Sequence, residues 1–412
     1  MTRHSSSSSF IRAFSSPPVL SLIFARIFYA VNWFNISSIF YLIVIDFKQD
    51  ISMLGLITAS FLVGIGLFQV VAGILAAKYS PMKIAICGIL IASVASLFSG
   101  LAIELSQMMI LRFIVGIGMA FFFGPSVILI SDYLGKGSEG LGVALLNSAQ
   151  ASGAIIGIFG WVLIAQTVGW RISLVISGIL GIVSGLFLVF TLARGEEKMK
   201  DKGRQQQQQQ QQFHSSYGTI KLSDLRQTLL NKSLIILGLA LLGIQIGWNV
   251  ISTFTVFYLK DHLHISPTIA GLVGSLSLVS ILVFSPVFGG IYTKIKNSKN
   301  LLLLCGVALS ISISIIALNT FYAAIISIIL AGFFAAGGFI IPYAKAKEIN
   351  EKYQPMYQTL AVSFVNGVSL FGAFWVPLLF SSIAKHSGYS IAWILGSLLT
   401  LVLILPIMRQ KL

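Results

Sequence analysis

Long apolar runs alternate with short polar connections along almost the whole chain. A helix needs about 20 apolar residues to cross a bilayer, and each of twelve runs is long enough. Open sheets are excluded because the backbone groups at their edges cannot be hydrogen-bonded in lipid. We therefore predict an all-α membrane protein whose twelve transmembrane helices lie near residues 20–45, 53–77, 84–103, 107–131, 141–166, 171–193, 233–258, 268–291, 300–318, 321–343, 358–384 and 390–408.

The composition agrees with this pattern. Of the 412 residues, 56% are hydrophobic and only 9% are charged, whereas about 25% are charged in an ordinary soluble domain. The mean hydropathy is +0.93. These values exclude a soluble enzyme and a largely disordered chain. Cys87 and Cys305 lie in apolar runs, so they form no disulfide framework.

The net charge of +15 comes from short connections rather than from one soluble basic face, which argues against a nucleic-acid partner. If the N-terminus is cytoplasmic, 21 of the 27 Lys and Arg residues lie on the cytoplasmic side. Only Lys48, Arg171, Lys260 and Lys385 lie outside. By the positive-inside rule we predict that both termini lie in the cytoplasm. We further expect a multi-pass protein of the plasma membrane that contacts lipid as a monomer.

Two polar segments interrupt the apolar pattern. Residues 1–18 are Ser-rich and basic, which suits an organelle transit peptide or, as we prefer, a cytoplasmic tail. Residues 194–232, with glutamines at 205–212, are expected to form a mobile cytoplasmic linker with a short surface helix at 221–230. The domains are then an N-terminal bundle at 19–193, a C-terminal bundle at 233–408 and a tail at 409–412.

The two halves of the chain repeat one another. Gly55 and Gly271 lie 216 residues apart, each followed by Leu. Residues 143–147 (Val-Ala-Leu-Leu-Asn) resemble 362–366 (Val-Ser-Phe-Val-Asn) at an offset of 219. Six helices, an even number, are repeated, so both halves point the same way. This predicts two six-helix bundles related by a pseudo-twofold axis along the membrane normal.

Three short motifs accompany the repeat, one after the second run, one inside the fourth and one opening the sixth. They contain Gly73, Lys78 and Lys83; Arg112, Gly116 and Gly118; and Gly169, Trp170 and Arg171. With these motifs, the chain resembles the major facilitator superfamily over essentially its whole length. The resemblance implies a secondary transporter working by alternating access, with no cofactor.

The first motif departs from the family pattern. Ala77, and Thr293 in the second copy, stand where the family has an Asp that is thought to lock one conformation. Two interpretations stay open: the motif residues form a gate with other partners, or the lysines are only positive-inside anchors. The residues concerned are Gly73, Lys78, Lys83, Gly289 and Lys294.

Polar residues inside the apolar runs are candidates for a substrate site, because polar groups in the membrane usually face a bundle interior or a wet cavity. Gln245, Trp248, Asn249 and Ser252 share one helical face. In the family, this helix faces the first one across the central cavity. The candidate substrate ligands are Tyr29, Asn32, Trp33, Asn35, Arg112, Gln150, Gln245, Trp248 and Asn249. The alternative is that the amides join neighbouring helices, an interpretation that we favour for Asn147 and Asn366.

Two arginines in the apolar runs, and the absence of acidic residues from the middle of those runs, limit the class of substrate. Arg112 lies about 8 Å from the start of its helix. Three roles stay open for it: an anion contact, a residue that tunes proton transfer, or a structural residue. Arg26 is expected to extend to the inner interface. All twelve acidic residues fall in loops or at helix ends, which disfavours organic cations, and no metal cluster or nucleophile indicates an enzyme.

We therefore expect a carrier of a small neutral or anionic metabolite, working as a uniporter, an exchanger or a symporter with H+. A proton-coupled drug exporter is the alternative, although Gly157 is followed by Ile158 and not by the Pro typical of such exporters. A substrate-sensing receptor on a transporter fold is a third hypothesis.

Overall fold

The computed structural model describes residues 16–134, 139–203, 230–295, 298–349 and 355–409. Within these ranges the chain is helical and contains no strand, which confirms the all-α class. The first half comprises α2 (Pro17–Phe47), α3 (Ile51–Lys78), α4 (Pro81–Ser99), α5 (Leu105–Leu134), α6 (Glu139–Ile155), the π-helical turn η1 (Ile156–Gly160) and α7 (Trp161–Gly203). The second half comprises α10 (Lys232–Asp261), α11 (Pro267–Lys294), α12 (Ser298–Ile316), α13 (Phe321–Ile349), α14 (Pro355–Gly372), α15 (Val376–Ser387), α16 (Tyr389–Ile404) and the 3-10 turn η2 (Leu405–Arg409).

These helices make twelve crossings. Eleven stretches in the described ranges are long and apolar enough to span a membrane, and one of them, Leu145–Thr191, holds two crossings. Gly169 separates the two, because its φ of 81° and ψ of 160° break the helix. This backbone region is accessible to glycine and costly for other residues. The eleventh crossing combines the end of α14 with α15.

Helix ends differ from the sequence expectations mainly in the linker. The backbone of α7 stays helical to Gly203, ten residues beyond the expected end at 193. The surface helix expected at 221–230 and the glutamine run lie outside the described residues, apart from Leu230.

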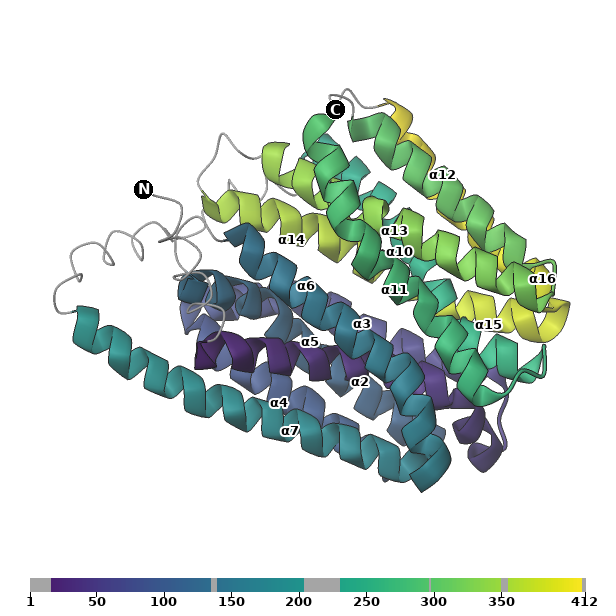
Figure 1. Ribbon diagram of the computed structural model, residues 1–412, viewed down its shortest axis with the longest axis horizontal. Helices are drawn as coiled ribbons and strands as arrows, with labels where there is room; N and C mark the ends of the chain where they lie inside the picture. The colour runs from purple at the N-terminus through teal and green to yellow at the C-terminus, as the bar shows by residue number, and fades with distance from the viewer. Residues whose placement is uncertain (1–15, 135–138, 204–229, 296–297, 350–354, 410–412) are drawn as a thin grey trace, which may run out of the picture.

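The internal repeat is visible in the helices. α3 and α11 each have 28 residues and begin 216 residues apart. Pro125 inside α5 corresponds to Pro342 inside α13, and Gly169 corresponds to Gly388, whose φ is 88°. In Figure 1, α2–α7 (purple to teal) and α10–α16 (green to yellow) form two bundles side by side. The two-bundle architecture predicted from the sequence is confirmed.

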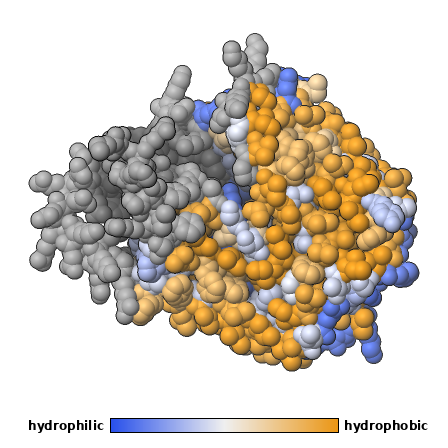
Figure 2. Space-filling view, in the orientation of Figure 1, coloured by the Kyte–Doolittle hydropathy of each residue, from blue (hydrophilic) through white to orange (hydrophobic). Residues whose placement is uncertain are grey.

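The outside of the molecule is apolar, as lipid contact requires. Large hydrophobic side chains such as Ile103, Leu186 and Val402 are more than half exposed. Figure 2 shows hydrophobic residues covering much of the face in view, with hydrophilic residues gathered toward its margins. The interior is also apolar, so burial from water does not by itself bring helices together in lipid, and close packing must.

Glycines provide that close packing around α5. A Cβ on Gly116 would lie 2.3 Å from the carbonyl oxygen of Phe61, and one on Gly64 would lie 2.3 Å from that of Phe113. The backbones of α3 and α5 therefore touch. Because Arg112 precedes Gly116 by about one turn, this contact sets the position of Arg112 against α3.

Candidate functional site

A pocket lies between the two halves, near the middle of the long helices. In this conformation it is narrow, with about 20 Å³ of space open to water-sized spheres, enough for about one or two water molecules. Pockets that enclose small molecules usually measure roughly 300–1,000 Å³, so a metabolite would need the two halves to move apart here. Residues from α2, α3, α5 and α10 line it: Trp33, Phe34, Ile36, Ser37, Ile57, Thr58, Phe61, Leu62, Arg112, Asn249 and Thr253.

Arg112 is the cation of this pocket. It is 2% exposed, and its Nη1 donates a 3.1 Å hydrogen bond to the backbone carbonyl of Asn32 on α2. Nε and Nη2 are buried without a hydrogen-bond partner. These two N–H groups form the planar edge of the guanidinium that binds a carboxylate through two parallel hydrogen bonds. The structure therefore holds Arg112 by one nitrogen and leaves the anion-binding edge unpaired.

Asn249 faces this arginine from the other half of the molecule. Gln245, one turn earlier in α10, donates from Nε2 to Asn249 Oδ1 at 3.0 Å. The acceptor of the Asn249 amide is thus occupied, whereas its Nδ2 is buried without a partner. Gln245 orients Asn249 so that the pocket receives a hydrogen-bond donor.

Asn32 and Asn35 face away from this pocket, into the first bundle. Asn32 Oδ1 accepts hydrogen bonds from Ser96 on α4 and from Ser177 on α7, the latter at 2.6 Å. Asn35 Nδ2 donates to Ser177 Oγ at 3.0 Å. Neither side chain lines the pocket, contrary to the expectation: the two serines across the bundle pair with Asn32 Oδ1 and Asn35 Nδ2, and Asn35 Oδ1 is buried without a partner. They join three helices, as buried amides in membranes often do.

The remaining candidate ligands surround the pocket or lie outside it. Trp33 lines the pocket, and Tyr29 packs on Trp33 with ring centroids 5.9 Å apart. Trp248 is 7% exposed and packs edge-on against Phe339 within the second bundle. Gln150 on α6 does not line the pocket, and its Oε1 is buried without a partner.

Arg26 is buried inside the first bundle and does not extend to the surface of the protein as expected. It is 4% exposed, and its guanidinium carbon lies 4.2 Å from the centroid of Tyr29 and 4.7 Å from that of Phe123. The helix α2 begins at Pro17, about two and a half turns before Arg26.

The residues of the first motif lie apart from the pocket. A Cβ added to Gly73 or Gly289 would meet no atom within 4 Å, and Lys83 is exposed. The side chains of Lys78 and Lys294 lie outside the described residues. The gating interpretation therefore stays a prediction.

The repeated asparagines have different environments. Asn366 is 8% exposed and accepts a 2.8 Å hydrogen bond from the Tyr343 hydroxyl, which fits the structural interpretation. Asn147 is exposed on α6.

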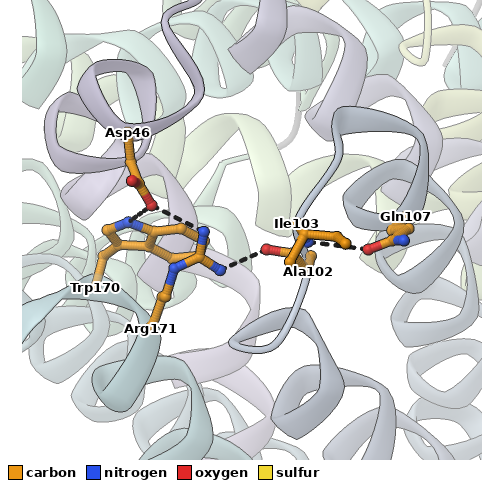
Figure 3. Close-up of polar contacts among 6 residues, drawn as sticks. All are labelled: Asp46, Ala102, Ile103, Gln107, Trp170 and Arg171. Carbon is orange, nitrogen blue, oxygen red and sulfur yellow. Dashed lines mark hydrogen bonds and ion pairs between the residues drawn. The ribbon is translucent and has the colours of Figure 1, made fainter.

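The third motif joins helix ends, as Figure 3 shows. Asp46, near the end of α2, accepts hydrogen bonds from Trp170 Nε1 at 3.0 Å and from Arg171 Nη2 at 2.9 Å. Arg171 Nη1 also donates to the carbonyl of Ala102, in the connection between α4 and α5. Asp46 is therefore an ion-pair partner of Arg171, and the turn at Gly169 places both donors beside it.

The same side of the molecule, called here the Asp50 side, is closed between the halves. Asp50, the N-cap of α3, forms a 2.8 Å ion pair with Lys385 at the end of α15. Gln166 accepts a 3.0 Å hydrogen bond from Thr268 of the second half. The opposite side, to which the linker is attached, is called the linker side.

Sequence reasoning found Trp33, Arg112 and Asn249 but missed most of the pocket. Ser37 and Thr253 each lie one turn after a candidate on the same helical face, so a longer stripe would have included them. The α3 residues carry no comparable signal, because Ile57, Phe61 and Leu62 are ordinary in an apolar run.

Comparisons with known proteins agree with this architecture. A sequence profile described as the Major Facilitator Superfamily matches residues 22–254 and 237–410. The nucleoside transporter NupG superposes with a TM-score of 0.71 at 15% identity, over 95% of this chain and 99% of that one. A D-xylose-proton symporter gives 0.73 at 16% identity, over 97% and 98%. At these identities the likeness shows the fold.

Two curated relatives match by sequence over a part of the chain. A probable sulfoacetate transporter, SauU, from Cupriavidus necator is 27% identical over 148 residues, which is 36% of this chain and 34% of that protein. The 4-hydroxybenzoate transporter PcaK from Pseudomonas aeruginosa is 24% identical over 147 residues, 36% and 33%. The matches span about a third of each relative's length. Because the family profile covers both halves, this multi-pass membrane protein belongs to the major facilitator superfamily of transporters.

Proposed function

We propose that the chain carries a small organic-acid anion across the membrane, bound between its two halves by Arg112 and Asn249. The observation that carries this proposal is the unpaired Nε–Nη2 edge of Arg112, buried in the pocket beside the unpaired Nδ2 of Asn249. A buried charge without a partner is costly, and an incoming carboxylate or sulfonate removes that cost. Both unpaired groups are donors, which favours an anion over a neutral metabolite.

The walls of the pocket also suit the body of an organic acid once the two halves separate enough to admit it. Trp33 and Phe61 line it and contact each other edge-on at 4.8 Å between centroids. Flat aromatic surfaces bind apolar or aromatic groups well. The names of SauU and PcaK refer to acids of this kind, sulfoacetate and 4-hydroxybenzoate, so these two compounds are suitable first probes.

Alternating access follows from the position of the pocket. It lies between two bundles that the Asp50–Lys385 pair holds together at one end. Rocking of the bundles would open that end and expose the anion to the other side. We place both termini in the cytoplasm in this scheme, which makes the linker side the inner one. The carrier would work in one of three modes: uniport, exchange or symport with H+.

Uptake by proteoliposomes tests the function. Full-length protein should accumulate radiolabelled 4-hydroxybenzoate or sulfoacetate by counterflow, and unlabelled acid should compete where the neutral methyl ester does not. Arg112→Gln and Asn249→Leu should each lower the initial rate at least about ten-fold, as loss of a charge-assisted hydrogen bond predicts. Arg409→Gln, at the exposed end of η2, is the matched control and should transport normally. Equal rates for Arg112→Gln and the control would refute the site.

A further inference from the structure

Arg26 is a second buried guanidinium that the pocket does not use. It is 4% exposed, and its Nε and Nη1 are buried without a hydrogen-bond partner. The three ion pairs found among the described residues join Arg171 to Asp46, Lys345 to Glu348 and Lys385 to Asp50. A buried charge that lacks such a partner is expensive to keep. Arg26 therefore also has unpaired N–H groups, although its Nε and Nη1 do not form the edge that binds a carboxylate through two parallel hydrogen bonds.

Aromatic side chains surround Arg26, and the Tyr29 hydroxyl also bonds the guanidinium, but Nε and Nη1 stay without a hydrogen-bond partner. Its guanidinium carbon lies 4.2 Å from the Tyr29 ring centroid and 4.7 Å from that of Phe123 on α5. Cation–π contacts stabilise a cation through the ring faces. The hydrogen bonds that Nε and Nη1 can donate stay available for an acceptor.

Arg26 lies on the helical face of α2 that leads to the pocket. Tyr29 follows at i+3 and Trp33 at i+7, and Trp33 lines the pocket. The helical rise between Arg26 and Trp33 is about 10 Å. α2 runs from the linker side toward Asp50, so Arg26 lies on the linker side of the pocket. The Asp50–Lys385 pair joins the halves on the other side of the pocket, so a molecule that enters or leaves on the linker side passes the level of Arg26.

A half-buried amide side chain, Gln150, lies at a similar level on the neighbouring helix. A Cβ on Gly153 of α6 would lie 2.2 Å from the carbonyl oxygen of Ile27, which fixes the register of α6 against α2. Gln150 is one turn before Gly153, on the linker side, and its Oε1 is buried without a partner. Because an amide oxygen accepts hydrogen bonds, Gln150 Oε1 adds no donor for an anion, and the donors at this level are the Nε and Nη1 of Arg26.

We propose that Arg26 forms a second anion-binding site, distinct from the Arg112 pocket, which holds a carboxylate or sulfonate on the linker side during its passage. This inference rests on the proposed transport of organic anions. Two guanidinium sites on one route let an anion leave the first without entering an apolar region unpaired. Binding at each site must be weak enough to release the anion, which suits a contact formed by few donors.

Thermal unfolding of the full-length protein in a neutral detergent tests binding separately from transport, because a ligand of the native state raises the melting temperature. The probe is 4-hydroxybenzoate, titrated against wild type, Arg112→Gln, Arg26→Gln and the double variant. We expect each single variant to keep part of the anion-dependent rise and the double variant to lose it. No remaining rise in Arg112→Gln would overturn the second site, whatever the transport result.

Additional arms distinguish anion binding at Arg26 from a structural role and from lipid binding. Arg26→Met should melt no lower than wild type without the anion, since it removes an unpaired buried charge; a large loss of stability would mean that Arg26 is a structural residue. Arg26→Lys keeps the charge and provides a second test if Arg26→Gln does not fold. A rise with glycerol phosphate but none with 4-hydroxybenzoate in Arg112→Gln would assign the site to a lipid headgroup and overturn the proposal.

Transport distinguishes this inference from the proposed function. Arg26→Gln should lower the initial rate of 4-hydroxybenzoate counterflow about ten-fold, with Arg409→Gln as the control. A wild-type rate in Arg26→Gln, with a strong loss in Arg112→Gln, would refute the second site and leave the pocket intact. Failure of every variant and of wild type to bind or carry the anion would refute both.

Discussion

Asn32 and Asn249 are both buried amides on facing helices, but only one is fully used by the protein. Asn32 Oδ1 accepts hydrogen bonds from Ser96 and Ser177, and its Nδ2 donates to the Phe28 carbonyl at 3.0 Å. Asn249 Oδ1 accepts from Gln245, and its Nδ2 has no partner. At the scale of the residue, this difference separates a structural amide from one available to a ligand.

We expect Asn32→Leu to destabilise the protein by about 1–2 kcal/mol, because two serine hydroxyls lose their buried acceptor. Asn249→Leu should cost less, since it removes one amide that is half unpaired. Thermal unfolding in detergent without ligand measures the difference as a lower melting temperature for Asn32→Leu. An equal or larger loss in Asn249→Leu would contradict this assignment.

The same pair shows what residue types reveal in advance. Both amides stood out in the sequence because polar groups are rare in apolar runs. Their roles could not be separated, because the partners of Asn32 are serines on α4 and α7, 64 and 145 positions away. Serine is too common in membrane helices to mark those positions. The burial of Arg26 could not be predicted for a related reason: one of the aromatic rings around it, Phe123, lies on α5, far away in the sequence.

At the scale of the element, each half contains one glycine at which a helix ends and the next begins. Gly169 has φ 81° and ψ 160°, and Gly388 has φ 88° and ψ 162°. An aromatic residue follows each, Trp170 or Tyr389. Trp170 and Arg171 reach Asp46 only because the chain turns at Gly169. The repeat thus preserves a backbone conformation as well as a sequence pattern.

Gly169→Ala should destabilise the protein by roughly 1–3 kcal/mol, because a side chain makes this backbone conformation strained. Gly388→Ala should have a similar effect. Gly367→Ala is the matched control: Gly367 is helical, and a Cβ there meets no atom within 4 Å. Melting temperatures measured side by side check the prediction, and a Gly169→Ala protein as stable as the Gly367→Ala protein would refute it.

Most of the helices and their arrangement could be predicted from the sequence, for physical reasons. Lipid forces each crossing to be a long apolar helix, so length and hydropathy locate the helices. The offset of 216 between Gly55 and Gly271 carried the symmetry, and both glycines pack against the opposite half: Gly55 against Ser381 and Gly271 against Val162. The α3 residues that line the pocket could not be predicted from the sequence. Whether a side chain such as Phe61 faces the pocket or lipid depends on the rotation of the helix, and a uniformly hydrophobic sequence does not indicate that rotation.

At the scale of the whole molecule, the Asp50–Lys385 pair connects the two bundles on one side. A hydrogen bond from the Lys385 ammonium and, with a smaller effect, one from Ser52 lower the pKa of Asp50 from 3.8 to about 2. A carboxyl whose pKa is lowered in the folded state contributes stability above its ordinary pKa and loses it as the pH falls through the lowered value. Asp50 therefore stays ionised throughout the physiological range.

We expect Lys385→Gln to favour opening of the Asp50 side. Both partners are nearly half exposed, so the pair contributes at most about 1 kcal/mol and the populations should shift no more than about five-fold. The readout is the rate at which a membrane-impermeant maleimide, added on the Asp50 side, labels Thr58→Cys in the pocket of a protein with Cys87→Ser and Cys305→Ala. The rate should rise in Lys385→Gln, return toward the original value with Asp50→Lys/Lys385→Asp, and stay unchanged in Lys48→Gln. The ratio of the Lys385→Gln rate to the parent rate should be constant from about pH 5 to 8, because Asp50 does not titrate there and the thiolate fraction of the cysteine changes equally in both proteins. A labelling rate that Lys385→Gln leaves unaltered would show that apolar packing such as Gly55 against Ser381, and not the ion pair, holds this side closed.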